Sequence, residues 1–192
     1  MRLTATCSRS LSMGHLTVIL GCMFAQKTTE LLRHIRRFKS IGFRVLVINY
    51  AHDTRYGTDV IASHDLDTVP ARSVLHLGDL RDEEIAAYDV IVIDEGQFFD
   101  DLRSHVESWV DGHEKLQVVV SGLDGDAGRR PFGQMLDLVP IAENVLRLSS
   151  YCSVCRDGTA AHFTKKVAGS SDTVDIGAAD KYVPVCRRHW LN

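Results

Sequence analysis

The chain has 192 residues, of which 45% are hydrophobic and 24% are charged, and its formal net charge is −3. A chain of this length can bury one good core with a small appendage, and its charge provides no global attraction to nucleic acid. No apolar run approaches the roughly 20 residues needed to span a bilayer, so the composition is that of a soluble globular protein without a membrane partner.

Short apolar runs recur along most of the chain and predict the strands of one sheet. They are apolar throughout rather than alternating, which is typical of strands buried on both faces of a mainly parallel sheet. Amphipathic segments at 29–38 and 101–112 predict helices, the second with Asp100 and Asp101 at its start and Gly112 at its end. This alternation predicts an α/β domain with helices on both faces. The predicted strands are Leu16–Leu20, Val45–Ile48, Val74–Leu77, Val90–Ile93, Val118–Val120 and Val145–Leu148.

A near-complete phosphate-binding loop follows the first of these runs. The pattern G-x-x-x-x-G-K-[ST] is matched at Gly21, Lys27 and Thr28, whereas its second glycine is replaced by Gln26. Between a strand and a helix, the backbone N–H groups of such a loop point at phosphate oxygens. We expect Lys27 to reach the terminal phosphates of a nucleotide and the Thr28 hydroxyl to hold Mg²⁺. The alternative is a helix start without a ligand.

A long polar segment, 51–72, separates the second run from the third and carries Asp53 and Arg55. A loop of this length in a compact domain is often functional. We expect the segment to be a flexible loop.

The fourth apolar run ends in two acids, Asp94 and Glu95. In P-loop proteins the corresponding strand supplies a carboxylate to the Mg²⁺ shell, a role that suits Asp94. Strand alternation turns Glu95 to the other side, where it can take a proton from a substrate hydroxyl as general base. The alternative is a solvated strand end.

Two metal-ligand pairs stand near the C-terminus, Cys152 with Cys155 and Cys186 with His189. The C-x-x-C and C-x-x-H spacing predicts a zinc ribbon that binds one Zn²⁺. A disulfide scaffold is the competing interpretation. It fits poorly with a nucleotide-binding domain of intracellular type.

These motifs divide the chain into three parts. Residues 1–13 carry Arg2 and Arg9 but no acidic residue, and the segment is short for a transit peptide, so we expect a disordered tail. Residues 14–148 form the predicted P-loop domain. Residues 149–192 are rich in Cys, Gly, Ser and Asp and form the predicted zinc-binding lobe.

The order of the motifs carries a family resemblance. They are Gly21–Thr29, Tyr50–Tyr56, Asp94–Phe99, Leu123–Gly125, Pro131–Gly133, Tyr151–Cys155 and Gly177–Tyr182. Together they resemble the type II, cytosolic-type thymidine kinases, from about residue 14 to the C-terminus. The resemblance implies a P-loop (RecA-like) fold, a cytoplasmic homotetramer or homodimer, and transfer of the ATP γ-phosphoryl group to the 5′-hydroxyl of thymidine. Deoxyuridine is an alternative acceptor, and no nucleic-acid partner is implied.

The resemblance also implies roles for individual residues. Glu95 would accept the proton of the thymidine 5′-hydroxyl. ATP and Mg²⁺ would be bound by Gly21, Gln26, Lys27, Thr28, Thr29, Asp53, Arg55, Asp94 and Gln97. Thymidine would be bound by Met23, Phe98, Asp175, Ile176 and Tyr182, with residues 164–182 as a lasso over it. Zinc at the foot of the lasso would be held by Cys152, Cys155, Cys186 and His189.

Two residues at the centre of the site depart from the family. The family has glycine at position 26, and a side chain there takes steric room and can add about 1–3 kcal/mol of backbone strain. At Ala127 the family usually has an aromatic residue on the thymine ring, and its loss can remove about 1–3 kcal/mol of stacking. A milder departure is Asp175, where a hydrophobic residue is common.

These departures leave three functions open. The first is a working thymidine kinase with an altered site. The second is a kinase-like subunit with weak or no activity that assembles with a competent partner. The third is a nucleic-acid-binding zinc ribbon on an ATPase core, which the scarcity of aromatic residues among the basic residues of the lobe disfavours.

Overall fold

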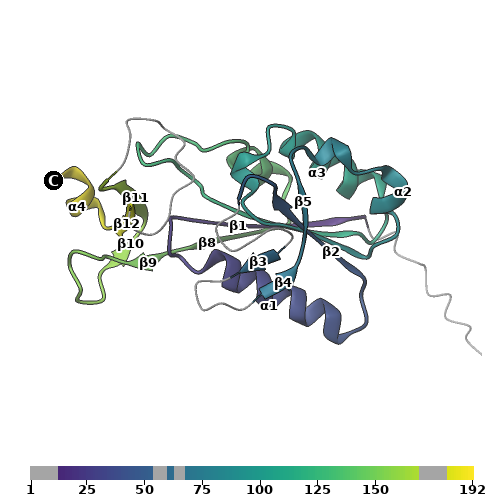
Figure 1. Cartoon of the computed structure of the whole chain (residues 1–192), viewed down its shortest axis with the longest axis horizontal. Helices are drawn as coiled ribbons and strands as arrows, with labels where there is room; N and C mark the ends of the chain where they lie inside the picture. The colour runs from purple at the N-terminus through teal and green to yellow at the C-terminus, as the bar shows by residue number, and fades with distance from the viewer. Residues whose placement is uncertain (1–12, 54–59, 63–67, 169–180) are drawn as a thin grey trace, which may run out of the picture.

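A six-stranded parallel sheet forms the centre of the molecule (Figure 1). The computed structural model describes residues 13–53, 60–62, 68–168 and 181–192. The strand order is β5-β2-β6-β7-β1-β8, and every neighbouring pair is parallel. The strands are β1 (His15–Gly21), β2 (Val45–Tyr50), β5 (Arg72–Val74), β6 (Val90–Ile93), β7 (Gln117–Gly122) and β8 (Asn144–Leu148).

The predicted strands are confirmed, although most extend one or two residues beyond the predicted runs. The third run is the exception, because most of it lies outside the strand. The sequence predicts a strand over Val74–Leu77, whereas β5 ends at Val74. Leu77 instead begins the 3-10 helix η1 (Leu77–Asp79), where its side chain is fully buried in the core. The apolar run continues to Leu77 because this residue is buried, and not because it belongs to a strand.

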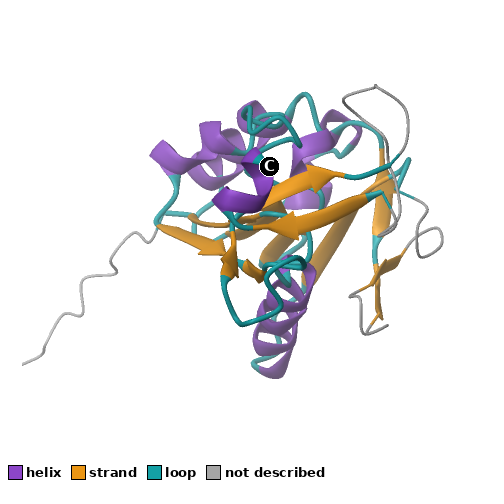
Figure 2. Cartoon of the chain, turned by 90° about the vertical axis from the view of Figure 1, so that its left-hand side faces the viewer, coloured by secondary structure: helices purple, strands orange, loops and turns teal. Residues whose placement is uncertain are grey.

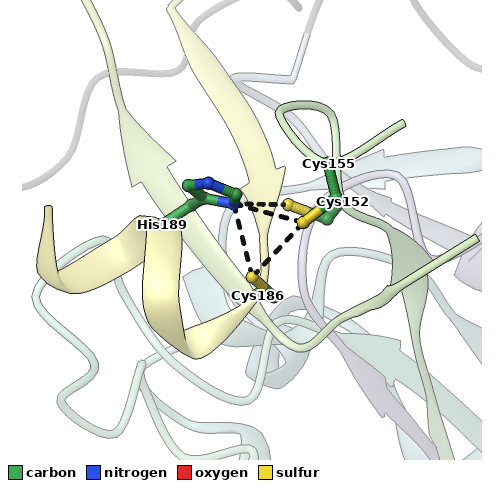
Figure 3. Close-up of side chains that lie close together, drawn as sticks. All are labelled: Cys152, Cys155, Cys186 and His189. Atoms are coloured by element: carbon green, nitrogen blue, oxygen red, sulfur yellow. Dashed lines mark hydrogen bonds between the residues drawn. The ribbon is translucent and has the colours of Figure 1, made fainter. Parts of the chain in front are cut away.

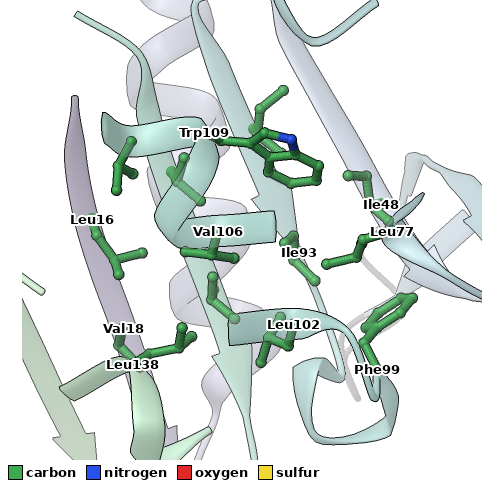
Figure 4. Close-up of a cluster of buried hydrophobic side chains, with 14 of the residues drawn as sticks. Leu16, Val18, Ile48, Leu77, Ile93, Phe99, Leu102, Val106, Trp109 and Leu138 are labelled. Atoms are coloured by element: carbon green, nitrogen blue, oxygen red, sulfur yellow. The ribbon is translucent and has the colours of Figure 1, made fainter. Parts of the chain in front are cut away.

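Helices cover both faces of the sheet, as predicted. Helix α1 (Lys27–Ser40) buries Leu31, Leu32 and Ile35 against one face. Helix α3 (Leu102–Gly112) buries its apolar side chains against the other, where Trp109 and Val106 pack over the strands (Figure 4). Within the described part of the chain, no helix is long and apolar enough to cross a membrane.

Helix α3 starts and ends where the sequence predicts, with Asp101 before it and Gly112 as its last residue, but it lacks a side-chain cap. Asp101 is the N-cap residue, but its side chain does not cap the helix. Its carboxylate instead accepts hydrogen bonds from the backbone N–H groups of Leu77, at 3.2 Å, and Gly78, at 2.9 Å. The residue therefore ties η1 to α3. Two further short helices complete this side of the domain, α2 (Asp82–Ile85) and η3 (Leu136–Ile141).

The segment 51–72 is more ordered than the predicted loop. Its described residues include β3 (Val60–Ala62) and β4 (Thr68–Pro70), which pair as an antiparallel hairpin. Ile61 is buried on the same side as α1. Arg55 lies outside the described residues, as do residues 1–12.

A small lobe follows β8 and lies at one end of the sheet (Figure 1), the end that faces the viewer in Figure 2. Its own core contains Cys152, Ala161 and Val185, with Trp190 packed against it. The lobe contacts the phosphate loop directly, because Met23 N donates to Thr164 Oγ1 at 3.1 Å. Its elements are β9 (Ser150–Tyr151), β10 (Ala160–Ala161), β11 (Phe163–Lys166), β12 (Tyr182–Val185) and α4 (Arg187–Leu191).

Candidate active site and metal centre

The phosphate loop joins β1 to α1 as the motif requires, and Gln26 is the N-cap residue of the helix. Gln26 has φ 63° and ψ 29°, a left-handed conformation that glycine adopts freely and other residues rarely adopt. Its exposed side chain accepts a hydrogen bond from Thr29 Oγ1 at 2.7 Å. The loop therefore keeps the backbone shape of a glycine-containing loop, and the side chain is directed to solvent and to the first helical turn.

The loop lysine lies inside the loop. Lys27 Nζ donates to the carbonyl oxygen of Cys22 at 2.8 Å. Burial lowers the pKa of Lys27, and the nearby negative charges, Glu95 first, act in the opposite direction. A buried ammonium group that donates to a neutral carbonyl is well placed to gain from the charge of a phosphate.

Asp94 and Thr28 meet as the metal role requires. Thr28 Oγ1 donates to Asp94 Oδ2 at 3.1 Å, and Asp94 Oδ1 accepts from the backbone N–H of Glu95 at 3.0 Å. Asp94 is only 5% exposed. Burial, and after it the charge of Glu95, raises the pKa of Asp94 to about 6.

The register of β2, β6 and β7 builds a polar row around this carboxylate. Ile48, Ile93 and Val120 are paired across these strands. The residues that follow them, Asn49, Asp94 and Ser121, therefore form a row across the sheet, on the face that α1 covers. Asn49 is 4% exposed, and its Oδ1 atom has no hydrogen-bond partner among the residues that the structure describes. Oxygen ligands around a buried carboxylate are what Mg²⁺ prefers, so the residues present fit the ion. The sequence analysis missed this row, because it depends on strand register.

Glu95 stands next to this row, but not through strand alternation as predicted. Strand β6 ends at Ile93, and Glu95 has φ 52°, again left-handed, as N-cap of the 3-10 helix η2 (Gly96–Phe98). Its carboxylate oxygen Oε2 accepts a hydrogen bond from Gln97 Nε2 at 2.6 Å. The turn, rather than the strand, sets the direction of this side chain.

A cavity of about 340 Å³ lies between the phosphate loop, the segment 123–133 and the lobe. Its lining includes Cys22, Asp124, Arg129, Phe163 and Thr164. Burial raises the pKa of the Cys22 thiol. Of these residues, only Thr164 is expected from the sequence to lie near the nucleoside, as the first residue of the predicted lasso. They come from separate segments that only the fold brings together.

None of the described residues expected to bind thymidine lines this cavity. Phe98 stacks on Tyr50 with ring centroids 5.3 Å apart and meets Phe132 edge-on at 5.6 Å. Tyr182 is buried in β12. Met23 contacts the lobe through its backbone.

Other predicted residues are only partly described. Asp53 is half-buried, and its backbone N–H donates to the Tyr50 carbonyl oxygen at 2.9 Å. Asp175 and Ile176, with most of the expected lasso, lie outside the described residues.

The segment with Ala127 is held from the lobe side. Trp190 Nε1 donates to the Ala127 carbonyl oxygen at 3.1 Å. The guanidinium of Arg129 lies over the Trp190 ring at 3.6 Å and near the Phe163 ring at 5.5 Å. Such cation–π contacts contribute roughly 0.5–2 kcal/mol. The aromatic side chains of the lobe therefore support the segment at the position where the family aromatic is missing.

The four predicted metal ligands converge in the lobe (Figure 3). His189 Nδ1 lies 3.5 Å from Cys152 Sγ, 3.3 Å from Cys155 Sγ and 3.5 Å from Cys186 Sγ. The sulfurs of Cys155 and Cys186 are 3.8 Å apart. A tetrahedral zinc with ordinary bond lengths requires ligand separations of about 3.6 Å for S–N and about 3.8 Å for S–S. The cluster therefore fits Zn²⁺.

Comparison with known proteins agrees with this arrangement. The family model described as thymidine kinase matches residues 14–190. The chain is 41% identical to cytosolic thymidine kinase of Gallus gallus over 91% of this chain and 75% of that protein. It is 42% identical to the human cytosolic enzyme over 94% of this chain and 74% of that one. It is 40% identical to thymidine kinase of Yaba monkey tumor virus over 91% and 93%. The chain therefore belongs to the thymidine kinase family, in its cytosolic, type II branch.

Proposed function

We propose that this chain phosphorylates thymidine at its 5′-hydroxyl with ATP. The observation that carries the proposal is the contact of Thr28 with Asp94 beside Glu95, at the end of a phosphate loop. This arrangement combines a place for phosphates, a place for a metal and a carboxylate base. Membership of the thymidine kinase family supports thymidine as the acceptor.

The chemistry is divided among few side chains. Lys27 and the backbone of the phosphate loop bind the β- and γ-phosphates. Glu95 accepts the proton of the 5′-hydroxyl as its oxygen attacks the γ-phosphorus, and the bond from that phosphorus to the bridging oxygen breaks to release ADP. Thr28 and Asp94 would hold Mg²⁺, which neutralises the developing charge on the phosphates. Positioning and electrostatics supply most of the rate in such transfers.

The lobe closes the nucleoside side of the site. Cys152, Cys155, Cys186 and His189 would hold Zn²⁺, whose role is to fix the lobe rather than to take part in transfer. By analogy with its family, we propose a cytoplasmic homodimer or homotetramer. Light scattering on the purified chain distinguishes these states from a monomer.

The test is a coupled assay of ADP release with thymidine or deoxyuridine as acceptor. The wild-type chain should turn over thymidine. Glu95→Gln should bind thymidine with nearly unchanged affinity but lower kcat by the ~10²–10⁴ expected for a lost general base. An unchanged kcat would remove Glu95 from the mechanism.

The kinase-like subunit without activity is the less favoured function. Gln26 occupies a left-handed position but leaves Lys27 inside the loop and Thr28 in contact with Asp94. If neither the wild-type chain nor Gln26→Gly phosphorylates thymidine, the inactive subunit becomes the better account.

A further inference from the structure

The side chain of Gln97 is held at both ends inside the domain. It is only 3% exposed. Its Nε2 donates to Glu95 Oε2 at 2.6 Å, and its Oε1 accepts from the backbone N–H of Leu123 at 2.9 Å. A backbone N–H can only donate, so the amide oxygen must face Leu123 and the amide NH₂ must face Glu95. The orientation of the amide is therefore fixed by its partners.

Backbone packing leaves this side chain little room to move. A Cβ at Gly122 would lie 2.7 Å from Gln97 Oε1, and a Cβ at Gly133 would lie 2.2 Å from the Gln97 carbonyl oxygen. Both distances are shorter than any ordinary contact, so these two glycines let the chain close around Gln97. The glutamine is consequently a rigid bridge from η2 to the segment 123–133.

Glu95 needs such a bridge because no strand orients it. It follows the end of β6 in a left-handed conformation, and its carboxylate lies at the end of a flexible side chain. A general base must lie within hydrogen-bond reach of the proton it takes, and misplacement by about 1 Å can lower a rate by roughly 100-fold. A charge-assisted hydrogen bond from a fixed amide meets this need.

We propose that Gln97 is the positioning residue for Glu95 and that it links the base to the wall of the nucleoside cavity. This role differs from the ATP-binding role that the family resemblance implies for Gln97. It rests on the proposed function, because it acts through Glu95 as the base. Through Leu123, the same amide joins the base to the segment that contributes Asp124 and Arg129 to the cavity.

The test is a double-mutant cycle between the two residues. Gln97→Glu keeps an oxygen for the Leu123 N–H but replaces the NH₂ donor by a second carboxylate oxygen facing Glu95. We expect kcat to fall by about 10- to 100-fold, with KM for ATP and for thymidine within about twofold of wild type. In the Glu95→Gln background, the same change should lower kcat no further, because the base it positions is already absent.

Each result separates the alternatives. A rise in KM for ATP, with kcat unchanged, would make Gln97 an ATP ligand and overturn the proposal. Losses that multiply in the double variant would also overturn it, since Gln97 would then act independently of Glu95. If Glu95→Gln alone retains full kcat, the base assignment fails first, and the positioning role fails with it. If Gln97→Glu does not fold by thermal scan, Gln97→Met, which lacks both polar partners, replaces it in the same cycle.

Discussion

The two ends of the site are built in different ways. At the phosphate end, Gly21, Lys27 and Thr28 come from the turn between β1 and α1. Asp94 follows β6, which β7 separates from β1 in the same parallel sheet. At the proposed nucleoside end, the wall of the cavity includes the segment 123–133, which contains no strand of the sheet. It is held by Gln97 from inside and by Trp190 from the lobe. The first end is fixed by sheet register, and the second by a few long-range side-chain contacts.

Each end carries one departure from the family, and the difference determines what each departure costs. Gln26 keeps the backbone conformation of a glycine, so its destabilising effect is backbone strain at that residue. Ala127 removes a contact, while the backbone around it is retained through Trp190 and the stacked Arg129. We therefore expect lesions at the first end to affect ATP kinetics and those at the second to affect thymidine kinetics.

Removing the metal centre should have the largest effect, because the lobe that it holds together supplies the Trp190 contact at the proposed nucleoside end. Cys186→Ala should lower the zinc content from one ion per chain to well below one and abolish most thymidine binding, because structural zinc contributes directly to folding. ATP binding, measured by calorimetry, should remain. Cys7→Ala, outside the metal motif, is the matched control. A wild-type chain purified without chelator that contains well under one zinc would contradict the assignment.

Without Mg²⁺ and at neutral pH, Asp94→Asn should raise the free energy of unfolding by up to about 3 kcal/mol. The pKa of Asp94 is raised from 3.8 to about 6 in the native state, so protonation of this carboxylate stabilises the native state relative to the unfolded state. This contribution is complete below pH 3.8 and is lost as pH rises to about 6, leaving a buried charge at neutral pH.

The asparagine variant without Mg²⁺ should therefore melt several degrees higher than wild type at pH 7.5, at about 2–4 °C per kcal/mol. The difference should vanish near pH 4. Added Mg²⁺ should stabilise only the wild type. Equal melting temperatures across this range would show that the carboxylate is not destabilised by burial.

Relief of strain at Gln26 should have the next largest effect. Gln26→Gly should raise kcat/KM for ATP at least about tenfold, or ~1.4 kcal/mol. Lys115→Gly is a suitable control because Lys115 also has positive φ, 66°, but precedes β7, at the end of the parallel sheet opposite the phosphate loop. If both variants leave ATP kinetics flat, strain at position 26 is not what limits the enzyme.

Restoring the aromatic at the nucleoside end should have the smallest effect. Ala127→Phe should lower KM for thymidine several-fold and leave KM for ATP unchanged, because base stacking contributes about 1–3 kcal/mol and part of that wall is already supported. The Trp190 bond is made to the backbone of Ala127 and survives the change. A larger gain from Ala127→Phe than from Gln26→Gly would reverse the order of the two lesions.

The same contrast explains how much the sequence could predict. Gly21, Lys27 and Thr28 lie close together in sequence, and Cys152 with Cys155 forms a short motif, so local spacing was enough to place them. The strands and the two main helices followed from apolar periodicity. The boundaries of the domain and lobe, and the individual roles of the site residues, remain predictions.

Contacts between distant segments could not be predicted. The bond of Gln97 to Leu123, the stacking of Arg129 on Trp190 and the row of Asn49 with Asp94 depend on which loops and strands the fold places together. Strands of three residues, such as β3 and β4, are too short to give a periodic signal. Glu95 shows the limit of local reasoning, because its left-handed turn, and not strand alternation, directs it.

The most direct measurement is transfer of labelled phosphate. The zinc-loaded wild-type chain is incubated with Mg²⁺, thymidine and ATP labelled at the γ-phosphate, and the nucleotides are separated. The account predicts labelled thymidine 5′-monophosphate, with formation that requires Mg²⁺ and falls by about 10²–10⁴ in Glu95→Gln. Release of labelled inorganic phosphate without labelled thymidine monophosphate, in the wild type and in Gln26→Gly alike, would contradict it.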